Sequence, residues 1–480
     1  MSAADPFATL SRVRRAPHRG NPTVALLGAA IAAVAISGGC RSHESSAAPV
    51  SSSKGLTTAE LQDPAECSGC HAQHFAQWSG SMHAYASDDP LYIAMNTRAQ
   101  RETNGAIGGF CAQCHAPVAL RLGTTTTGLD LADASAAQHG VTCYFCHSVD
   151  AVNGVSDDPL HLASDGVLRA DIADPVATTA HASAYSALHD QQQAGSAALC
   201  GACHDVTIAN GQVPIEQTFA EWKTTIYAVD TPQALLACSG CHMPGTQGTA
   251  ASPPNVVPIR TVHDHSVPGV DLALIPFPEQ DAQASLVQTS LDPVVTATLC
   301  VQPPDAGDSV SITLDDAFVG HAWPTGAVHD RRAWVEVVAT AGEQTVFTSG
   351  VVPNDQTSVE TIGDPNLWLL KETLLDGNGN PVLFMWQATT VQPHALPPAV
   401  TNDPTDPRYP HSVTRSYPVP GGADDVKMRV RILPVAVEVV QSLIESGDLD
   451  ASYLAKIGAL TLSGTELEWS LAVNGYGCVP

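Results

Sequence analysis

Five copies of the pattern Cys-x-x-Cys-His, all between residues 67 and 242, constrain this chain more than any other feature of its sequence. In this pattern the two thiols can add to the vinyl groups of a haem, and the adjacent His can bind its iron. Roughly 0.01 copies are expected by chance at these Cys and His frequencies. The sequence therefore predicts five covalently bound c-type haems. We expect thioether bonds at Cys67, Cys70, Cys111, Cys114, Cys143, Cys146, Cys200, Cys203, Cys238 and Cys241, and proximal iron ligands at His71, His115, His147, His204 and His242.

Zinc binding and dithiol redox chemistry are the alternatives for such motifs. A structural zinc site needs pairs of Cys-x-x-Cys units that close four-ligand sites, and an odd number of units, each followed by His, does not fit this requirement. A redox-active dithiol does not explain the His. The haem interpretation is therefore favoured over both.

The first 40 residues are typical of an export signal. Four Arg precede an apolar run from Val24 to Ile36, which is short for a transmembrane helix. The run leads to Ser37-Gly38-Gly39-Cys40, which is similar to a bacterial lipoprotein cleavage box, although Ser37 stands where Leu is usual. We expect lipidation of Cys40, with an uncleaved anchor or ordinary signal cleavage as alternatives. Each predicts an exported protein, membrane-anchored in the periplasm or on the outer cell surface.

Two cysteines, Cys300 and Cys478, remain when the motifs and Cys40 are set aside from the 13 in the chain. In an oxidising compartment two leftover thiols predict a disulfide. This bond would join the two ends of the last third of the chain.

The formal net charge of −27 makes nucleic acid and anionic lipid surfaces poor partners. We expect redox protein partners that present basic faces, and no nucleic acid. The alternative is that the charge only keeps the protein soluble in a saline medium.

Composition divides the chain into four segments. Residues 1–40 form the predicted signal peptide, and the Ser- and Ala-rich residues 41–60 a flexible tether. Residues 61–285 are predicted to form a pentahaem domain, mostly helical and loop, because porphyrins can supply its apolar core. Helical fragments are expected at 66–86 and 218–227. Residues 290–480 are predicted to form an antiparallel β-sandwich, so the expected fold class is multidomain α + β.

The sandwich prediction rests on alternating apolar and polar residues with turn signals between the runs. One helix is expected to interrupt the strands, beginning near Pro434 and ending at Gly447. The segment 376–380 has the composition of a calcium loop, but a hairpin turn is the favoured interpretation. The expected strands are 310–315, 333–339, 367–375, 381–386, 426–433 and 466–473.

Short phrases beside the motifs carry a family resemblance. They are Cys67–Tyr85 with Trp78, Ser81 and His83, then Gly140–Thr142, Leu188–His189, Glu221–Trp222, Met243–Pro244 and His265–Gly269. These phrases resemble the multihaem cytochrome family that includes the tetrahaem electron acceptor of hydroxylamine oxidoreductase. The resemblance covers roughly residues 63 to 270, and the number of motifs departs from the tetrahaem member. Larger members of such families also carry a sandwich that begins with a phrase similar to Gly320-His321-Ala322-Trp323-Pro324-Thr325-Gly326.

The second axial ligands are expected to be mostly His, because the chain has 19 His and only six Met. Haems with two His ligands, lacking the Met that raises the potential, predict a low-potential protein. The resemblance implies distal ligands at His83 and at His265, with His263 as the alternate of His265. His181 and His189 compete for a third position, and His139 is a fourth candidate with His161 as its alternate.

His321 is a further distal candidate, because Pro324 and Gly326 can fix its loop against a neighbouring haem. The alternative is a turn His that only packs on Trp323. For each distal candidate the alternative is a His bonded to a haem propionate or to backbone, and His74 is expected to be such a case because it cannot reach over the haem of His71.

Two classes of function follow. The first is electron transfer between membrane-side donors and a periplasmic or extracellular acceptor. The second is a multihaem oxidoreductase that acts on a small nitrogen or sulfur compound and needs an open iron position. No Cys-x-x-Cys-Lys motif is present, so the Lys-ligated active haem of pentahaem nitrite reductases is not expected. Electron transfer is therefore the favoured function, and no catalytic residue is predicted.

Overall fold

The computed structural model describes residues 56–176, 178–208, 212–229, 235–252, 257–306, 310–420 and 422–480. The predicted signal peptide, Cys40 and most of the predicted tether lie outside these residues. The described residues belong to one compact unit. Helix α1 (Thr58–Gln62) begins inside the segment predicted as tether. Among the described residues, none of the helices combines the length and apolar character needed to cross a membrane.

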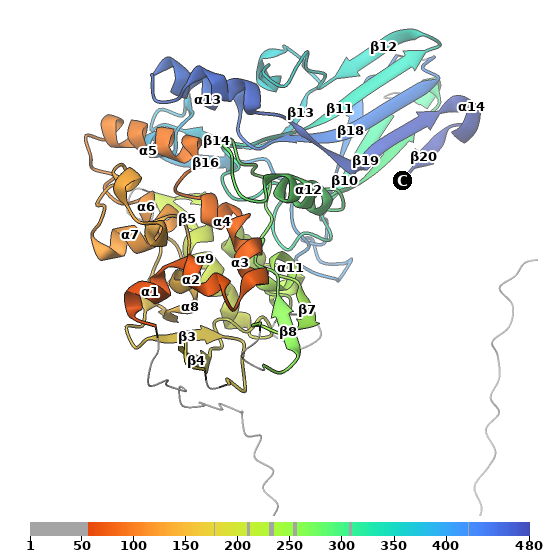
Figure 1. Ribbon diagram of the computed structural model, residues 1–480. Coiled ribbons are helices and arrows are strands. Elements are labelled where there is room, and N and C mark those ends of the chain that lie inside the picture. The colour runs from red at the N-terminus through yellow and green to blue at the C-terminus, as the bar shows by residue number, and fades with distance from the viewer. Residues whose placement is uncertain are drawn as a thin grey trace, which may run out of the picture. The chain divides into compact units, whose positions relative to one another are not determined.

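Short helices carry the five motifs (Figure 1). The single helix expected at 66–86 is instead three, α2 (Pro64–Ser68), α3 (Ala72–Ser79) and α4 (Met82–Tyr85). Gly80 ends α3, and the Ser81 hydroxyl accepts the Ala84 N–H and starts α4 in a new direction. The helix expected at 218–227 ends at Lys223. The other helices here are α6 (Ala112–His115), α7 (Pro117–Leu122), α8 (Cys143–His147), α9 (Ala197–His204), α10 (Thr218–Lys223), α11 (Cys238–His242) and α12 (Gln280–Leu291).

Helix α5 (Pro90–Glu102) was not predicted, although its start carries a sequence signal. The Asp89 carboxylate accepts the Leu91 N–H at 3.0 Å, and Pro90 occupies the first helical position, where no N–H is needed. The helix lies beside α13 (Val437–Glu445) of the C-terminal region (Figure 1). Arg98 donates to the Ser442 carbonyl at 2.9 Å, and Arg101 pairs with Asp448. Helix α5 therefore joins the two halves of the chain.

Four two-stranded ladders separate the helices of the first half. The β3–β4 ladder is parallel and the other three are antiparallel. The strands are β1 (Val149–Val152), β2 (Leu160–Leu162), β3 (Val167–Ala170), β4 (Ala182–Tyr185), β5 (Val206–Ile208), β6 (Val213–Glu216), β7 (Gly245–Gly248) and β8 (Arg260–His263).

The second half contains antiparallel sheets, as predicted. One has the strand order β17-β10-β9-β20, and a larger one has the order β12-β11-β18-β19 with β13 also paired to β11. Their buried side chains form one hydrophobic cluster, which includes Leu299, Ile312, Val335, Val430 and Trp469. A sandwich architecture stays a prediction. The strands are β9 (Thr296–Val301), β10 (Val310–Asp315), β11 (Arg332–Ala341), β12 (Gln344–Ser349), β13 (Trp368–Leu370), β17 (Ser412–Tyr417), β18 (Asp425–Leu433), β19 (Leu460–Ser470) and β20 (Gly477–Val479).

A smaller sheet has the order β15-β14-β16, with strands β14 (Glu372–Leu375), β15 (Pro381–Val382) and β16 (Thr390–Pro393). The predicted hairpin turn at 376–380 is confirmed, since β14 and β15 pair through it. The Asp376 carboxylate accepts the Asn378 and Asn380 N–H groups at 2.8 and 2.9 Å. The predicted strand 381–386 is wrong beyond Val382, where a 3₁₀ turn follows at Met385–Gln387.

Three further boundaries differ from the prediction. Helix α13 begins at Val437 rather than at Pro434, because the Ala436 N–H donates to the Asp330 carbonyl at 2.7 Å and holds Ala436 extended. The strand expected at 367–375 is divided at Lys371 between β13 and β14. The strand expected at 466–473 is instead β19, which starts at Leu460, followed by helix α14 (Leu471–Asn474).

The predicted disulfide is confirmed. Cys300 of β9 is bonded to Cys478 of β20, and the two residues are cross-strand partners. Helix α12 spans the boundary expected at 285–290, and its Val287 and Leu291 belong to the hydrophobic cluster of the sheets. The division into a haem domain and a sheet domain stays a prediction.

Candidate haem sites

Each Cys-x-x-Cys-His motif forms one turn of helix, which gives its three functional side chains a common direction. Residues three and four positions apart lie on the same side of a helix, so both sulfurs and the imidazole face one space. Motifs two to five lie at or in α6, α8, α9 and α11. In the first motif the His71 N–H donates to the Cys67 carbonyl at 2.8 Å, which makes the same turn between α2 and α3.

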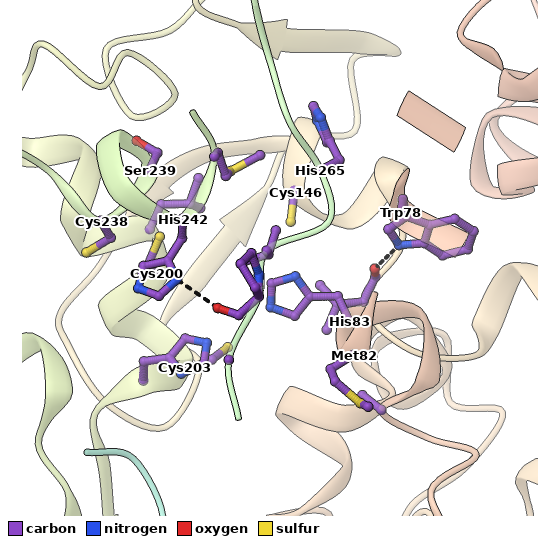
Figure 2. Close-up of a pocket in the computed structure, with 18 of the residues that line it drawn as sticks. Trp78, Met82, His83, Cys146, Cys200, Cys203, Cys238, Ser239, His242 and His265 are labelled. Atoms are coloured by element: carbon purple, nitrogen blue, oxygen red, sulfur yellow. Dashed lines mark hydrogen bonds between the residues drawn. The ribbon is translucent and has the colours of Figure 1, made fainter. Parts of the chain in front are cut away.

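All five motifs open into one continuous cavity of about 1520 Å³. Small-molecule sites usually have about 300–1,000 Å³, so this space exceeds what one organic ligand needs. Figure 2 shows Cys146, Cys200, Cys203 and Cys238, from three motifs, around one part of it together with His83 and His242. Aromatic side chains from several elements complete the wall. They include Phe75, Trp78, Phe145, Phe219 and Trp222. A space of this size and lining fits several porphyrins.

Four of the five motif imidazoles are held in the tautomer that a metal ion requires. A carbonyl oxygen can only accept, so an Nδ1 bonded to a carbonyl carries the proton and leaves the Nε2 lone pair free. The Nδ1–H groups of His71 and His147 donate to the Ala250 and Arg169 carbonyls, both at 2.6 Å. His242 donates to the Pro268 carbonyl at 3.0 Å, and His115 donates to the Ala86 carbonyl at 3.1 Å.

Burial also favours the neutral form of two of the paired rings. The pKa of His204 is lowered to about 4, mainly by burial and then by the nearby His83 and His242. The pKa of His321 is lowered to about 4, again mainly by burial. Neutral imidazole is the form that binds iron.

Four of the five motif imidazoles lie near the imidazole of a residue distant in the sequence. His74 also lies 6.1 Å from His71, but it stands only three residues away and its ring is tilted by 60°. A metal–imidazole bond is about 2 Å long and the ring centre lies about 1.1 Å further, so rings on opposite sides of one ion have centres about 6.2 Å apart. The ring centres of His71 and His181 are 6.2 Å apart, and those of His83 and His204 are 6.3 Å apart.

The other two pairs have the same spacing. His147 and His265 are 6.2 Å apart and nearly parallel, and His242 and His321 are 6.4 Å apart with a 17° angle between their planes. In His181, His265 and His321 the Nδ1–H also donates to a backbone carbonyl, at 2.9–3.1 Å. The four pairs therefore have the spacing that two axial ligands need. In three of them, all except His83 and His204, both rings also have the required tautomer.

The second motif differs. The ring of His115 stacks on Tyr92 at 4.4 Å with an 11° angle between the planes, and among the described residues no ring of another His has such contact with it. Tyr92 lies on α5, which the sequence patterns did not predict.

The remaining candidate histidines have other partners. The His189 Nε2–H donates to the Cys146 carbonyl at 2.9 Å, although its ring also lies 5.7 Å from that of His147. His139 pairs with Asp88 at 2.7 Å, and His161 pairs with Asp150 at 2.5 Å. Neither of these two lines the cavity. His263 lines it, and its Nδ1–H donates to the Met243 carbonyl at 3.0 Å.

Sulfurs of different motifs also meet. The thiols of Cys67 and Cys143, of Cys114 and Cys203, and of Cys200 and Cys238 lie close enough to shift each other's pKa. Because thioether sulfurs mark the edge of a porphyrin, these contacts bring the attachment edges of three pairs of motifs side by side.

Comparisons with known proteins agree with this site. Residues 66–148, which contain the first three motifs, match the family model described as "Cytochrome c554 and c-prime". A solved structure, the penta-heme cytochrome c552 from Thermochromatium tepidum, is similar over 86% of this chain and 98% of that chain. Its TM-score is 0.57 and its sequence identity is 21%, a likeness of fold. No curated protein matches. With the five motifs, these similarities support the identification of the chain as a multihaem c-type cytochrome.

Proposed function

We propose that this protein is an exported cytochrome that carries five c-type haems and transfers electrons between a membrane-side donor and a periplasmic or extracellular acceptor. The observation that carries the proposal is the set of four imidazole pairs with ring centres 6.2–6.4 Å apart. A haem bound between two imidazoles supplies reversible one-electron iron chemistry. The protein's part is to hold both rings, to exclude other ligands and to bury the site.

The pairs support specific ligand assignments. We assign His181 opposite His71, His265 opposite His147, His83 opposite His204, and His321 opposite His242. His189 is not assigned, because its Nε2–H is bonded to a carbonyl. His139 is not assigned either, because Asp88 binds its ring outside the cavity.

The proposal includes the location and the partners of the protein. The signal-like residues 1–40 and the haem motifs support export, since c-type haems are attached outside the cytoplasm. Cys40 is the proposed lipid anchor. The net charge of −27 supports redox partners with basic faces. The one hydrophobic cluster shared by both large sheets supports a sandwich, which we propose presents the His321 loop to the fifth haem.

One observation favours a second function at the second motif. Among the described residues no second imidazole lies at the axial-pair spacing from His115, whose ring stacks on Tyr92 instead. An iron with one axial ligand can bind a small molecule, so this site supports an oxidoreductase acting on a small nitrogen or sulfur compound.

Spectroscopy of the intact protein tests both proposals. Mass spectrometry of the denatured protein is expected to give five haems per chain. Electron paramagnetic resonance is expected to give four low-spin haems and one high-spin haem, and the reduced protein is expected to bind one carbon monoxide. Five low-spin haems without carbon monoxide binding would overturn the oxidoreductase function and leave electron transfer. Fewer than four low-spin haems would overturn the ligand assignments.

A further inference from the structure

The loop that carries His321 belongs to the C-terminal half of the chain, yet it faces a motif of the first half. It runs from Gly320 to Gly326, after β10, and the His321 ring lies 6.4 Å from that of His242. A loop needs fixed contacts with the motif region if its imidazole is to keep such a distance.

Glu221 of α10 makes two hydrogen bonds to the loop with one oxygen. Its Oε2 accepts the Ala322 N–H at 3.2 Å and the Thr325 O–H at 2.7 Å. The Thr325 oxygen lies 2.9 Å from the Thr218 hydroxyl, and because Thr325 donates to Glu221, Thr218 is the donor in this third bond. The carboxylate thus contacts the loop on both sides of Trp323, next to His321.

Helix α10 is itself fixed to the fourth motif. Asp205 directly follows His204, and its carboxylate accepts the Phe219 and Ala220 N–H groups at 3.0 and 3.1 Å. Phe219 packs so closely on Gly201 of the motif that an added Cβ would lie 2.4 Å from the ring. The oxygen that holds the His321 loop therefore stands on an element that cannot shift independently of the motif region.

Other contacts of the loop are weaker positioning devices. The Tyr227 hydroxyl donates to the Ala317 carbonyl at 2.8 Å, four residues before His321. Gly320 lies against Trp222, with 3.6 Å between a built Cβ and the indole. These contacts hold the approach to the loop, and Trp323 exchanges two backbone hydrogen bonds with Leu396, at 3.2 and 2.8 Å, within the sheet half. The Glu221 bonds instead join the residues that follow His321 to the motif half. Charge-assisted hydrogen bonds are also stronger than neutral ones.

We propose that Glu221 is a positioning residue of the fifth haem site, which sets the His321 imidazole opposite His242. The inference rests on the proposed function, because it requires His321 as an iron ligand. Helix α10 thereby couples the two halves of the chain. Through Glu221, the motif half determines the position of His321, which belongs to the sheet half.

Carbon monoxide binding to the reduced intact protein tests the inference, because it counts irons that lack a second ligand. His321→Ala is expected to bind one more carbon monoxide per molecule than the wild type. Glu221→Ala is expected to bind between zero and one additional carbon monoxide per molecule. Thr325→Val is expected to bind less than Glu221→Ala but more than the wild type. Glu221→Gln keeps an oxygen that accepts both bonds and is expected to stay close to the wild type. Glu343→Ala removes an exposed carboxylate far from the loop and serves as the matched control.

A double variant separates positioning from general stability. If Glu221 acts through His321, then Glu221→Ala/His321→Ala binds no more carbon monoxide than His321→Ala alone. The inference is overturned, with His321 still a ligand, if Glu221→Ala and Thr325→Val both bind carbon monoxide like the wild type while His321→Ala gains a site. If His321→Ala gains none, the ligand assignment falls and the inference falls with it. Should Glu221→Ala not fold, Thr325→Val decides the question.

Discussion

The two halves of this molecule solve the problem of forming a core in different ways. The sheets of the second half share one continuous hydrophobic cluster, in which Leu299, Ile312, Val335 and Trp469 are almost completely buried. The motif half has only small clusters, such as the one of Val118, Phe145, Val149, Leu160 and Ala202, arranged around a cavity of about 1520 Å³. The sheets can exclude water with their own side chains, whereas the motif half needs its cofactors to fill the space.

The largest expected effect is on protein made without haem attachment. The amides of residues 61–270 are expected to exchange at least about 100-fold faster than in the haem protein, which corresponds to about 3 kcal/mol. The amides of β10, β11 and β18 are expected to keep most of their protection. Hydrogen exchange with mass spectrometry measures both regions in one sample. Equal loss of protection in both would contradict the difference between the halves.

A second prediction concerns the disulfide of the sheet half. Replacing both cysteines, as in Cys300→Ser/Cys478→Ser, is expected to lower the free energy of unfolding by about 2–4 kcal/mol, because the bond closes a long loop in the unfolded chain. The loss is expected in the sheets, with the haem absorption spectrum of the native protein unchanged. Urea unfolding followed by circular dichroism measures the stability of the sheets, and the absorption spectrum reports on the haems. A changed haem spectrum before unfolding would mean that β20 supports the motif half as well.

The smallest effect is expected at Glu372, which lies where the halves meet. The pKa of Glu372 is raised to about 7, mainly by burial and then by the nearby Glu221 and Glu216 of the motif half. The folded state therefore holds a proton that the unfolded chain releases above its ordinary pKa. Stability from this group is present below about pH 4.5 and is lost as the pH rises towards 7, at about 1.4 kcal/mol per pH unit.

Glu372→Gln removes this dependence. The variant is expected to gain about 1–3 kcal/mol relative to the wild type between pH 5 and pH 8, as measured by urea unfolding at the two pH values. An equal difference between the proteins at both pH values would show that Glu372 is not protonated in the folded state.

The sequence was informative where chemistry is local. The motifs fix their own helical turns, and the alternation at 310–315 predicts β10. The disulfide joins residues 178 apart and could be predicted only because two cysteines were left over. The pairing of imidazoles could not be predicted in the same way, because His71 and His181 are far apart in the sequence and only the fold brings their rings together. His139 could not be judged from its neighbours, since its partner Asp88 lies 51 residues away. Helix α5 was missed although Asp89 and Pro90 signal its start.

The pairing of β20 with β9 also sets an order in time. Protein synthesis runs from the N-terminus. Every Cys-x-x-Cys-His motif has therefore been made long before β20, the strand that completes the sheet β17-β10-β9-β20. The imidazole proposed for the fifth iron comes from the later part. A newly made chain would thus hold its fifth haem by one imidazole first and acquire the second only when the C-terminal half has folded. The coordination of that iron would then report that the C-terminal half has folded.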